Sequence, residues 1–240
     1  MQPLQEKTTT FQPAATTRMR VLAINSLFPN AVQPYWGIFN ACALEHLTSS
    51  AQVRVISPVK WFPGLGLASS KERSLSLIPR SGEYHGLPVS YPRFFRTPGF
   101  GRRWHGWMYY ASLYRHFQKI IDEYNPDVLL ASWVHPDGFA AQRIGEQSGI
   151  PVAVKCLGSD IHQLLNDGSR AQQVLNTLTR CTRVIVVSES LKKMIVARGI
   201  SEQKIDVVYN GVARHVFRPM PRGEARRLLF YFFLQLLPID

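Results

Sequence analysis

The chain has 240 residues, 45% of them hydrophobic, which is enough to bury a sizeable core in one large domain or two small ones. Its formal net charge is +12 at pH 7. Cys42, Cys156 and Cys181 are far apart and form no CxxC pair, which argues against a disulfide framework and a structural zinc site and fits a reducing cytoplasm.

Residues 1–18 are polar and lack the apolar core of a secretory signal, so we expect them to form a disordered tail. The folded part is expected over residues 19–219. Residues 220–240 end in the apolar run LLFYFFLQLLPID, which is shorter than the ~20 apolar residues that span a bilayer. We interpret this aberrant tail as the product of a truncation or frameshift. The alternative is an interfacial anchor.

Apolar runs and turn residues predict strands and helices in alternation. Strands are expected over residues 20–25, 52–57, 87–91, 128–134, 152–157, 184–187 and 204–209. Helices are expected over residues 38–47, 105–124 and about 169–180, between 134 and 152, and from a capping Ser188 to Gly199. This order predicts an α/β fold with a doubly wound, mostly parallel sheet of about seven strands and right-handed crossovers.

Polar residues follow several of these strands, where ligands bind in an open parallel sheet. His135 follows one strand, and its neutral imidazole could accept a proton or hydrogen-bond a hydroxyl group, or it could simply be satisfied locally. Asp160 follows the next strand and could equally be a helix cap. Gly37 opens a helix, where backbone N–H groups can receive a phosphate, or it relieves a turn.

A basic and aromatic segment lies between Tyr84 and Ile121 and contains no carboxylate. Such a mixture favours an anionic membrane interface over a nucleic-acid duplex. We expect membrane contact at Arg93, Arg96, Arg102, Arg103 and Trp104. Six residues of the helix that follows recur at spacings of three and four, and we interpret them as a core-facing stripe: Trp107, Tyr110, Ala111, Tyr114, Phe117 and Ile121.

Other functional classes have weaker support. No GxSxG, HExxH or Walker sequence occurs, so the sequence does not favour a hydrolase, a zinc protease or a P-loop enzyme. A nucleic-acid binder is suggested by the high pI alone, and we expect no nucleic-acid partner.

The order of strand endings resembles the amino-terminal, Rossmann-like domain of a family 4 glycosyltransferase of the GT-B fold, of the kind that builds teichuronic acid and exopolysaccharide chains. The resemblance covers residues 19–219. The matching pieces are Phe28-Pro29-Asn30 with Gly37, His135, Gly158-Ser159-Asp160, the VVSES helix start, and VVYNGV followed by FRP.

The resemblance implies transfer of a sugar from a nucleotide diphosphate sugar to a glycan or lipid-linked acceptor, with retention and with neither a bound metal nor another cofactor. It implies that the backbone at Gly37 approaches the donor diphosphate and that His135 contacts the donor sugar or the reacting centre. Ser159 and Asp160 would contact the acceptor or shape the cleft. Asn210-Gly211-Val212 would be the turn into a second domain.

The chain departs from the family pattern after this point. The family continues into a donor-binding domain with basic residues and paired glutamates, whereas 21 residues follow Pro219 here, and Ala213 replaces the usual acidic residue. We therefore expect an incomplete and inactive hexosyltransferase of cell-surface polysaccharide synthesis, cytoplasmic and peripheral at the inner face of the plasma membrane. The alternative is a stand-alone acceptor-binding module at the membrane, paired with a separate donor-binding chain.

Overall fold

The computed structural model describes residues 18–65, 69–97, 101–165, 167–168, 170–212 and 219–236, without the side chains of 71 and 232–236. It divides into two units, the first of which ends at Tyr209, earlier than the domain boundary expected at 219. Residues 1–17 of the expected tail, Ala213 and the start of the FRP sequence lie outside the described residues.

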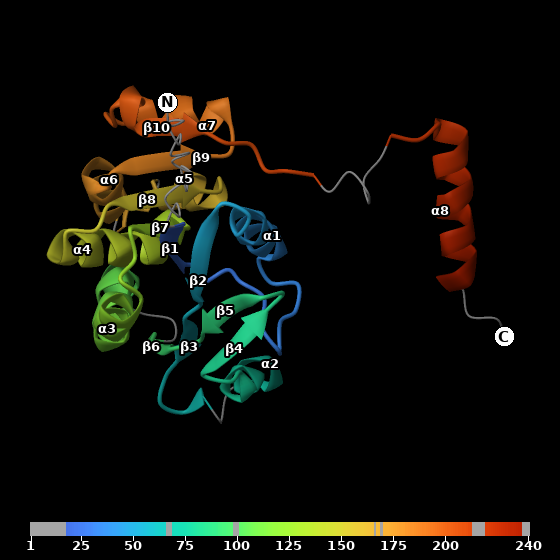
Figure 1. The fold of residues 1–240 in the computed structure, drawn as a ribbon. Coiled ribbons are helices and arrows are strands. Elements are labelled where there is room, and N and C mark those ends of the chain that lie inside the picture. Colours follow the sequence, from blue (N-terminus) through green and yellow to red (C-terminus); the bar gives the residue numbers. More distant parts are fainter. Residues whose placement is uncertain are drawn as a thin grey trace, which may run out of the picture. The chain divides into compact units, whose positions relative to one another are not determined.

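The first unit contains an eight-stranded sheet in the order β10-β9-β8-β7-β1-β2-β5-β4 (Figure 1). Neighbouring strands are parallel except for β4 and β5. A separate parallel pair joins β3 and β6. The strands are β1 Met19–Ile24, β2 Ala51–Ile56, β3 Val59–Trp61, β4 Ser81–Tyr84, β5 Leu87–Ser90, β6 Arg93–Phe95, β7 Val128–Ser132, β8 Val152–Cys156, β9 Arg183–Val186 and β10 Ile205–Val207.

The predicted fold class is confirmed, and each expected strand is present. The sheet gains β4 at its edge, which carries no apolar run and was not expected. The helices are α1 Ile38–Leu47, α2 Ser70–Arg73, α3 His105–Tyr124, α4 Phe139–Ser148, α5 Ser159–Leu164, α6 Ala171–Arg180, α7 Glu189–Val196 and α8 Arg222–Leu236, with short helical turns η2 Ser74–Leu77, η3 Arg102–Trp104, η4 Val134–Gly138 and η5 Glu202–Lys204. Ser188 caps α7 as expected, since its Oγ accepts from the Leu191 N–H at 3.3 Å.

Both faces of the sheet are buried, which explains why its strands read as continuous apolar runs. Successive residues of β1 point to opposite faces. Leu22 and Ile24 belong to the larger core, beneath α3, α4, α6 and α7. Val21 and Ala23 belong to the smaller core, which Leu44 of α1 joins from the other side of the sheet (Figure 1). The helices thus cover both faces and leave the carboxyl ends of the central strands accessible.

The stripe expected on α3 is confirmed in part, since Phe117 is buried and the partly buried Tyr110 and Ile121 pack against the larger core. The buried residues of this helix are Gly106, Tyr109, Leu113, Phe117 and Tyr124. Phe117 alone belongs to both sets, whereas Trp107 is 45% and Tyr114 is 39% exposed. The error arose because aromatic residues occur on both faces of α3, while a glycine marks the face that packs most closely.

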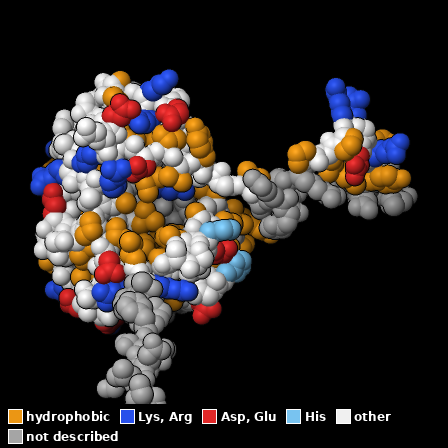
Figure 2. Space-filling view, turned by 45° about the horizontal axis from the view of Figure 1, so that its top comes forward, with side chains coloured by type: hydrophobic (Ala, Val, Ile, Leu, Met, Phe, Trp, Pro, Cys, Tyr) orange, Lys and Arg blue, Asp and Glu red, His pale blue; other side chains and the backbone are white. Residues whose placement is uncertain are grey.

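The second unit contains α8, whose side chains Leu228, Leu229, Phe230 and Tyr231 are exposed. Figure 2 shows hydrophobic and basic side chains on this helix, and basic side chains spread between hydrophobic patches on one face of the first unit. Over the described ranges, no helix has both the length and the apolar character needed to cross a membrane. Residues 237–240 lie outside the described residues.

Candidate active site

A cleft of about 780 Å³ lies at the carboxyl ends of β1, β2 and β7. The chain runs from β1 to β2 on one side and reaches β7 on the other, so the strand order reverses between β1 and β7. Doubly wound sheets bind ligands at such a switch point. The lining includes Ser26 after β1, Ser57 after β2 and His135 after β7.

The turn after β7 has a strained backbone. Trp133, which is not a glycine, has a φ of 93°. Such a conformation costs about 1–3 kcal/mol and persists where the surroundings impose it. Here the Trp133 N–H donates to the Lys155 carbonyl at 2.9 Å, and the Trp133 carbonyl accepts from the Gly138 N–H at 3.0 Å. These two hydrogen bonds fix the backbone conformation of the turn that carries His135.

The Asp160 carboxylate accepts a hydrogen bond from the backbone of the same turn. The residue is buried, and one carboxylate oxygen accepts from the Val134 N–H at 3.0 Å. Its other oxygen accepts from the N–H groups of Leu157, Gly158 and Ile161 at 2.9–3.1 Å. Burial raises the pKa of Asp160, against the opposing effect of these backbone hydrogen bonds. The structure thus places Asp160 beneath the cleft, where it joins the ends of β7 and β8, whereas Ser159 is exposed.

His135 lines the cleft and is 2% exposed. The Gln173 amide nitrogen donates to the Arg103 carbonyl at 2.7 Å, which directs the Gln173 oxygen to Nε2 of His135 at 3.2 Å. Because that oxygen only accepts, Nε2 carries the proton and Nδ1 is an acceptor. Nδ1 is buried and has no hydrogen-bond partner among the described residues. Burial lowers the pKa of His135 to about 4, so the ring is neutral at pH 7.

A second histidine packs beside it. The rings of His105 and His135 meet edge to face, with centroids 5.7 Å apart. Burial, together with the nearby His135, lowers the pKa of His105 to about 3. Gly106 permits this approach, because a Cβ there would lie 2.7 Å from Nε2 of His135. The two rings therefore form a neutral, closely packed wall.

Asp137, which follows β7, links the ends of β7 and β1 behind the cleft by hydrogen bonds to Ser26. It is fully buried and accepts from the N–H and Oγ of Ser26 at 2.9 and 2.8 Å. It also accepts a short hydrogen bond from the Tyr109 hydroxyl. Burial raises the pKa of Asp137 to about 7, against the lowering effect of these bonds. The sequence contained a signal for this residue, since Asp137 shares the strand-end run with His135.

We expect Asp137→Asn to flatten the pH dependence of stability. In the unfolded chain this carboxyl ionises near pH 4, whereas in the fold its pKa is about 7. The free energy of unfolding should therefore fall as the pH rises between these values, by up to about 1.4 kcal/mol per pH unit. Denaturant titrations of both proteins at pH 5 and pH 7 measure the effect. An unchanged difference between the two proteins at the two pH values would contradict it.

Gly37 begins α1 with a φ of 67°, and a Cβ there would lie 1.9 Å from the Leu27 carbonyl oxygen. Close packing on the β1–α1 loop thus explains the glycine. The indole nitrogen of Trp36 donates to the Ser26 carbonyl at 3.3 Å, and Trp36 lines the cleft. The first N–H groups of a helix have no partner within it, so the start of α1 offers donors near the cleft.

The charged side chains of the cleft are mainly basic. Lys60 pairs with Glu72 at 2.6 Å, and Arg170 pairs with Asp167 at 2.5 Å. Arg96 lines the same cleft. Within the described part of the chain, no group of three His, Cys, Asp or Glu residues is placed to hold a metal ion.

The residues expected at a membrane fall into three groups. The first is Arg96, an exposed residue that lines the cleft. Arg93, where membrane contact was expected, is half-buried and donates to the backbone carbonyls of Tyr91 and Ile78, so it stabilises the chain around β6. Arg102, Arg103 and Trp104 are exposed in η3. Sequence reasoning missed His105 and Arg170, which line the cleft, and Gln173, which bonds His135, because they come from segments that the fold alone brings together.

The profile of Glycosyltransferase Family 4 matches residues 51–215. A protein described as a teichuronic acid biosynthesis glycosyltransferase, TuaC of Bacillus subtilis, is 26% identical over 146 residues. The match covers 60% of this chain and 37% of that protein.

Solved structures share the fold at low sequence identity. HepE of Anabaena in complex with UDP and glucose is 16% identical with a TM-score of 0.51, and the match covers 88% of this chain and 50% of that one. The UDP-GlcNAc 2-epimerase of Methanocaldococcus jannaschii, in complex with UDP-GlcNAc and UDP, is 16% identical with a TM-score of 0.50, and the match covers 80% and 47%. The chain thus spans at most half the length of these proteins.

Proposed function

The chain belongs to glycosyltransferase family 4, and from this premise we propose that it serves the transfer of a sugar from a nucleotide diphosphate sugar to a lipid-linked or glycan acceptor in cell-surface polysaccharide synthesis. The observation that carries the proposal is the cleft at the switch point, with His135 on its wall. The similarity to TuaC supports the pathway class, and the neighbours solved with UDP-sugars support the class of donor.

In this proposal His135 contacts a sugar hydroxyl at the reacting centre. Its unpartnered Nδ1 is a neutral acceptor. A buried acceptor without a partner costs about 1–3 kcal/mol, which a hydroxyl that reached the atom would recover. With a pKa of about 4, His135 orients substrate by hydrogen bonding and does not store a proton at pH 7. The transfer would be of the retaining hexosyl type and would require no metal.

We further propose that this chain supplies the acceptor side of the reaction. The nucleotide would be bound by residues outside the first unit, in the same polypeptide or in another chain. The lengths of TuaC and of the solved neighbours support such a division. The exposed Arg102, Arg103 and Trp104 favour a variant in which the chain is an acceptor-binding module at the cytoplasmic face of the plasma membrane.

A transfer assay tests the proposal. The chain is combined with the donor-binding domain of a family member, as a fusion or as a separate protein, and given radiolabelled UDP-glucose or UDP-GlcNAc with a polyprenyl diphosphate saccharide. We expect label to enter the acceptor when both proteins are present. Hydrolysis of the donor with no acceptor product would contradict the proposal, and efficient transfer by the chain alone would refute the division of the site.

A further inference from the structure

Three pockets of the first unit adjoin one another and share lining residues. The active-site cleft shares Arg96, His105 and Arg170 with a smaller pocket of about 280 Å³. That pocket in turn shares Arg102 and Met108 with an open groove of about 910 Å³. A continuous surface therefore leads from the cleft to the exposed side of α3.

The smaller pocket is cationic. Arg96 reaches it from the end of β6, Arg102 from η3 and Arg170 from the segment before α6. Among the described residues that line it, none is acidic. Within the part of the chain that the structure describes, Arg170 pairs with Asp167, whereas Arg96 and Arg102 form no ion pair. Because guanidinium groups bind phosphate oxygens with paired hydrogen bonds, this arrangement suits a phosphate or diphosphate group.

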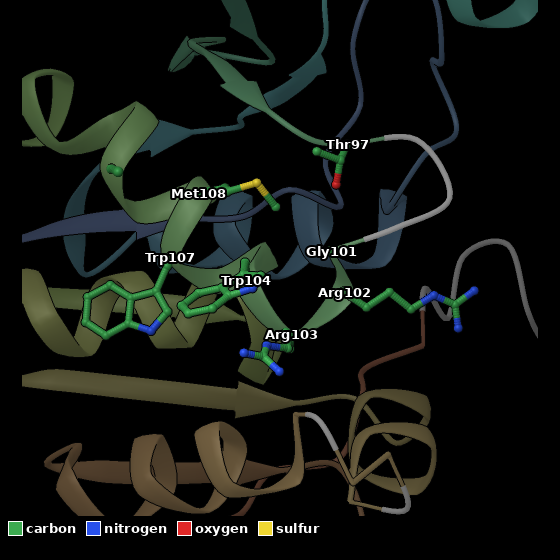
Figure 3. Close-up of a pocket in the computed structure, with 8 residues that line it drawn as sticks. Thr97, Gly101, Arg102, Arg103, Trp104, Trp107 and Met108 are labelled. Carbon is green, nitrogen blue, oxygen red and sulfur yellow. The ribbon is translucent and has the colours of Figure 1, made fainter.

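The open groove is apolar. Its walls include Trp104 and Trp107, which are 53% and 45% exposed. Figure 3 shows both indole rings and Met108 bordering the groove, with Arg102 extending on the side away from Trp107. Arg143 lies 4.4 Å from the centre of the Trp107 ring and fixes its orientation. An exposed apolar groove that continues into a cationic pocket matches a molecule with an apolar chain and a phosphate.

We propose that the acceptor is a lipid phosphate. Its phosphate or diphosphate binds Arg96, Arg102 and Arg170, its chain lies along Trp104 and Trp107, and its head group carries the accepting hydroxyl into the cleft. This inference rests on the proposed function in treating the lipid as the acceptor. The binding itself requires no sugar transfer and is measured without a donor.

Titration calorimetry of the full chain with soluble probes tests the inference. We expect one farnesyl diphosphate per chain, bound about tenfold or more tightly than inorganic diphosphate, because only the former buries apolar surface. Farnesol and UDP should bind less tightly than farnesyl diphosphate. Arg102→Glu should weaken both diphosphates about tenfold, since it removes a charge-assisted contact. Lys193→Glu, on the exposed side of α7, changes the net charge equally and should leave both affinities unchanged.

The apolar groove is tested separately. Trp107→Ser should reduce the affinity for farnesyl diphosphate to that for inorganic diphosphate and leave the latter unchanged. Trp104→Ser, at a more exposed position, provides a second variant should Trp107→Ser fold poorly.

Equal affinities for the two diphosphates would overturn the lipid proposal, as would equal losses in Arg102→Glu and Lys193→Glu. UDP binding as tight as that of farnesyl diphosphate, with the same dependence on Arg102, would assign the pocket to the donor. These outcomes leave sugar transfer to a lipid-free glycan possible. Tight lipid binding without any transfer would refute the proposed function alone.

Discussion

Replacing His135 with alanine should lower kcat/KM for sugar transfer about 100-fold, the usual cost of removing one positioned hydrogen-bonding group from a transition state. The measurement uses the chain combined with its donor-binding domain. His135→Asn should retain more activity than His135→Ala, because its amide oxygen offers an acceptor near the position of Nδ1. His46→Ala is the matched control, since His46 is exposed on α1 and its ring Nδ1 bonds the Cys42 carbonyl of the same helix.

The pH profile distinguishes the proposed role from general base catalysis. With a pKa of about 4, His135 changes charge well below neutrality, so it should contribute no break in kcat/KM between pH 6 and pH 9. A break near pH 6.5 that disappears in His135→Ala would contradict a neutral hydrogen-bonding role. Full activity of a folded His135→Ala protein would remove the residue from the mechanism.

Asp160→Ala should be among the most destabilising single changes in the first unit. It would leave the N–H groups of Val134, Leu157, Gly158 and Ile161 without their buried acceptor. We expect a loss of at least about 3 kcal/mol in the free energy of unfolding, since hydrogen bonds to a charged group are each worth about 1.5–3 kcal/mol. Thermal unfolding should show a decrease in Tm of roughly 10 °C.

Asp160→Asn refines this prediction. It retains one acceptor oxygen for the bonds of the β8–α5 turn but places an NH2 group opposite the Val134 N–H. Its stability should therefore lie between those of the parent and Asp160→Ala, and its transfer activity should fall because the turn before His135 is released. An Asp160→Ala protein as stable as the parent would show that water or other groups satisfy these donors.

The elements of this fold were predictable because local pattern determines them. Strands buried on both faces must be continuously apolar, so the runs at Val128–Ser132 and Val152–Cys156 stand out from the surrounding sequence. His135 could be predicted for the same reason, since a polar residue directly after a buried strand lies at the ligand-binding edge of the sheet. The edge strand β4 lacks such a pattern, because its residues face solvent.

The remainder of the site depends on contacts between distant segments. The tautomer of His135 depends on Gln173, which in turn depends on the Arg103 carbonyl, and no spacing in the sequence links these positions. The core-facing side of α3 was predicted only in part, because Gly106 packs against His135 but has no side chain that would mark this face in the sequence. The basic segment could be recognised in the sequence. Only the fold shows that Arg93 has a structural role, whereas Arg102 lines a pocket.

Hydrogen exchange of the chain with and without a polyprenyl diphosphate saccharide tests most directly whether the cleft between β1 and β7 receives the acceptor. Our account predicts slower amide exchange in residues 25–37 and 133–138, which border the cleft, and unchanged exchange in α7 (Glu189–Val196). At saturating acceptor, unchanged exchange in both cleft segments, or protection confined to other elements, would contradict it.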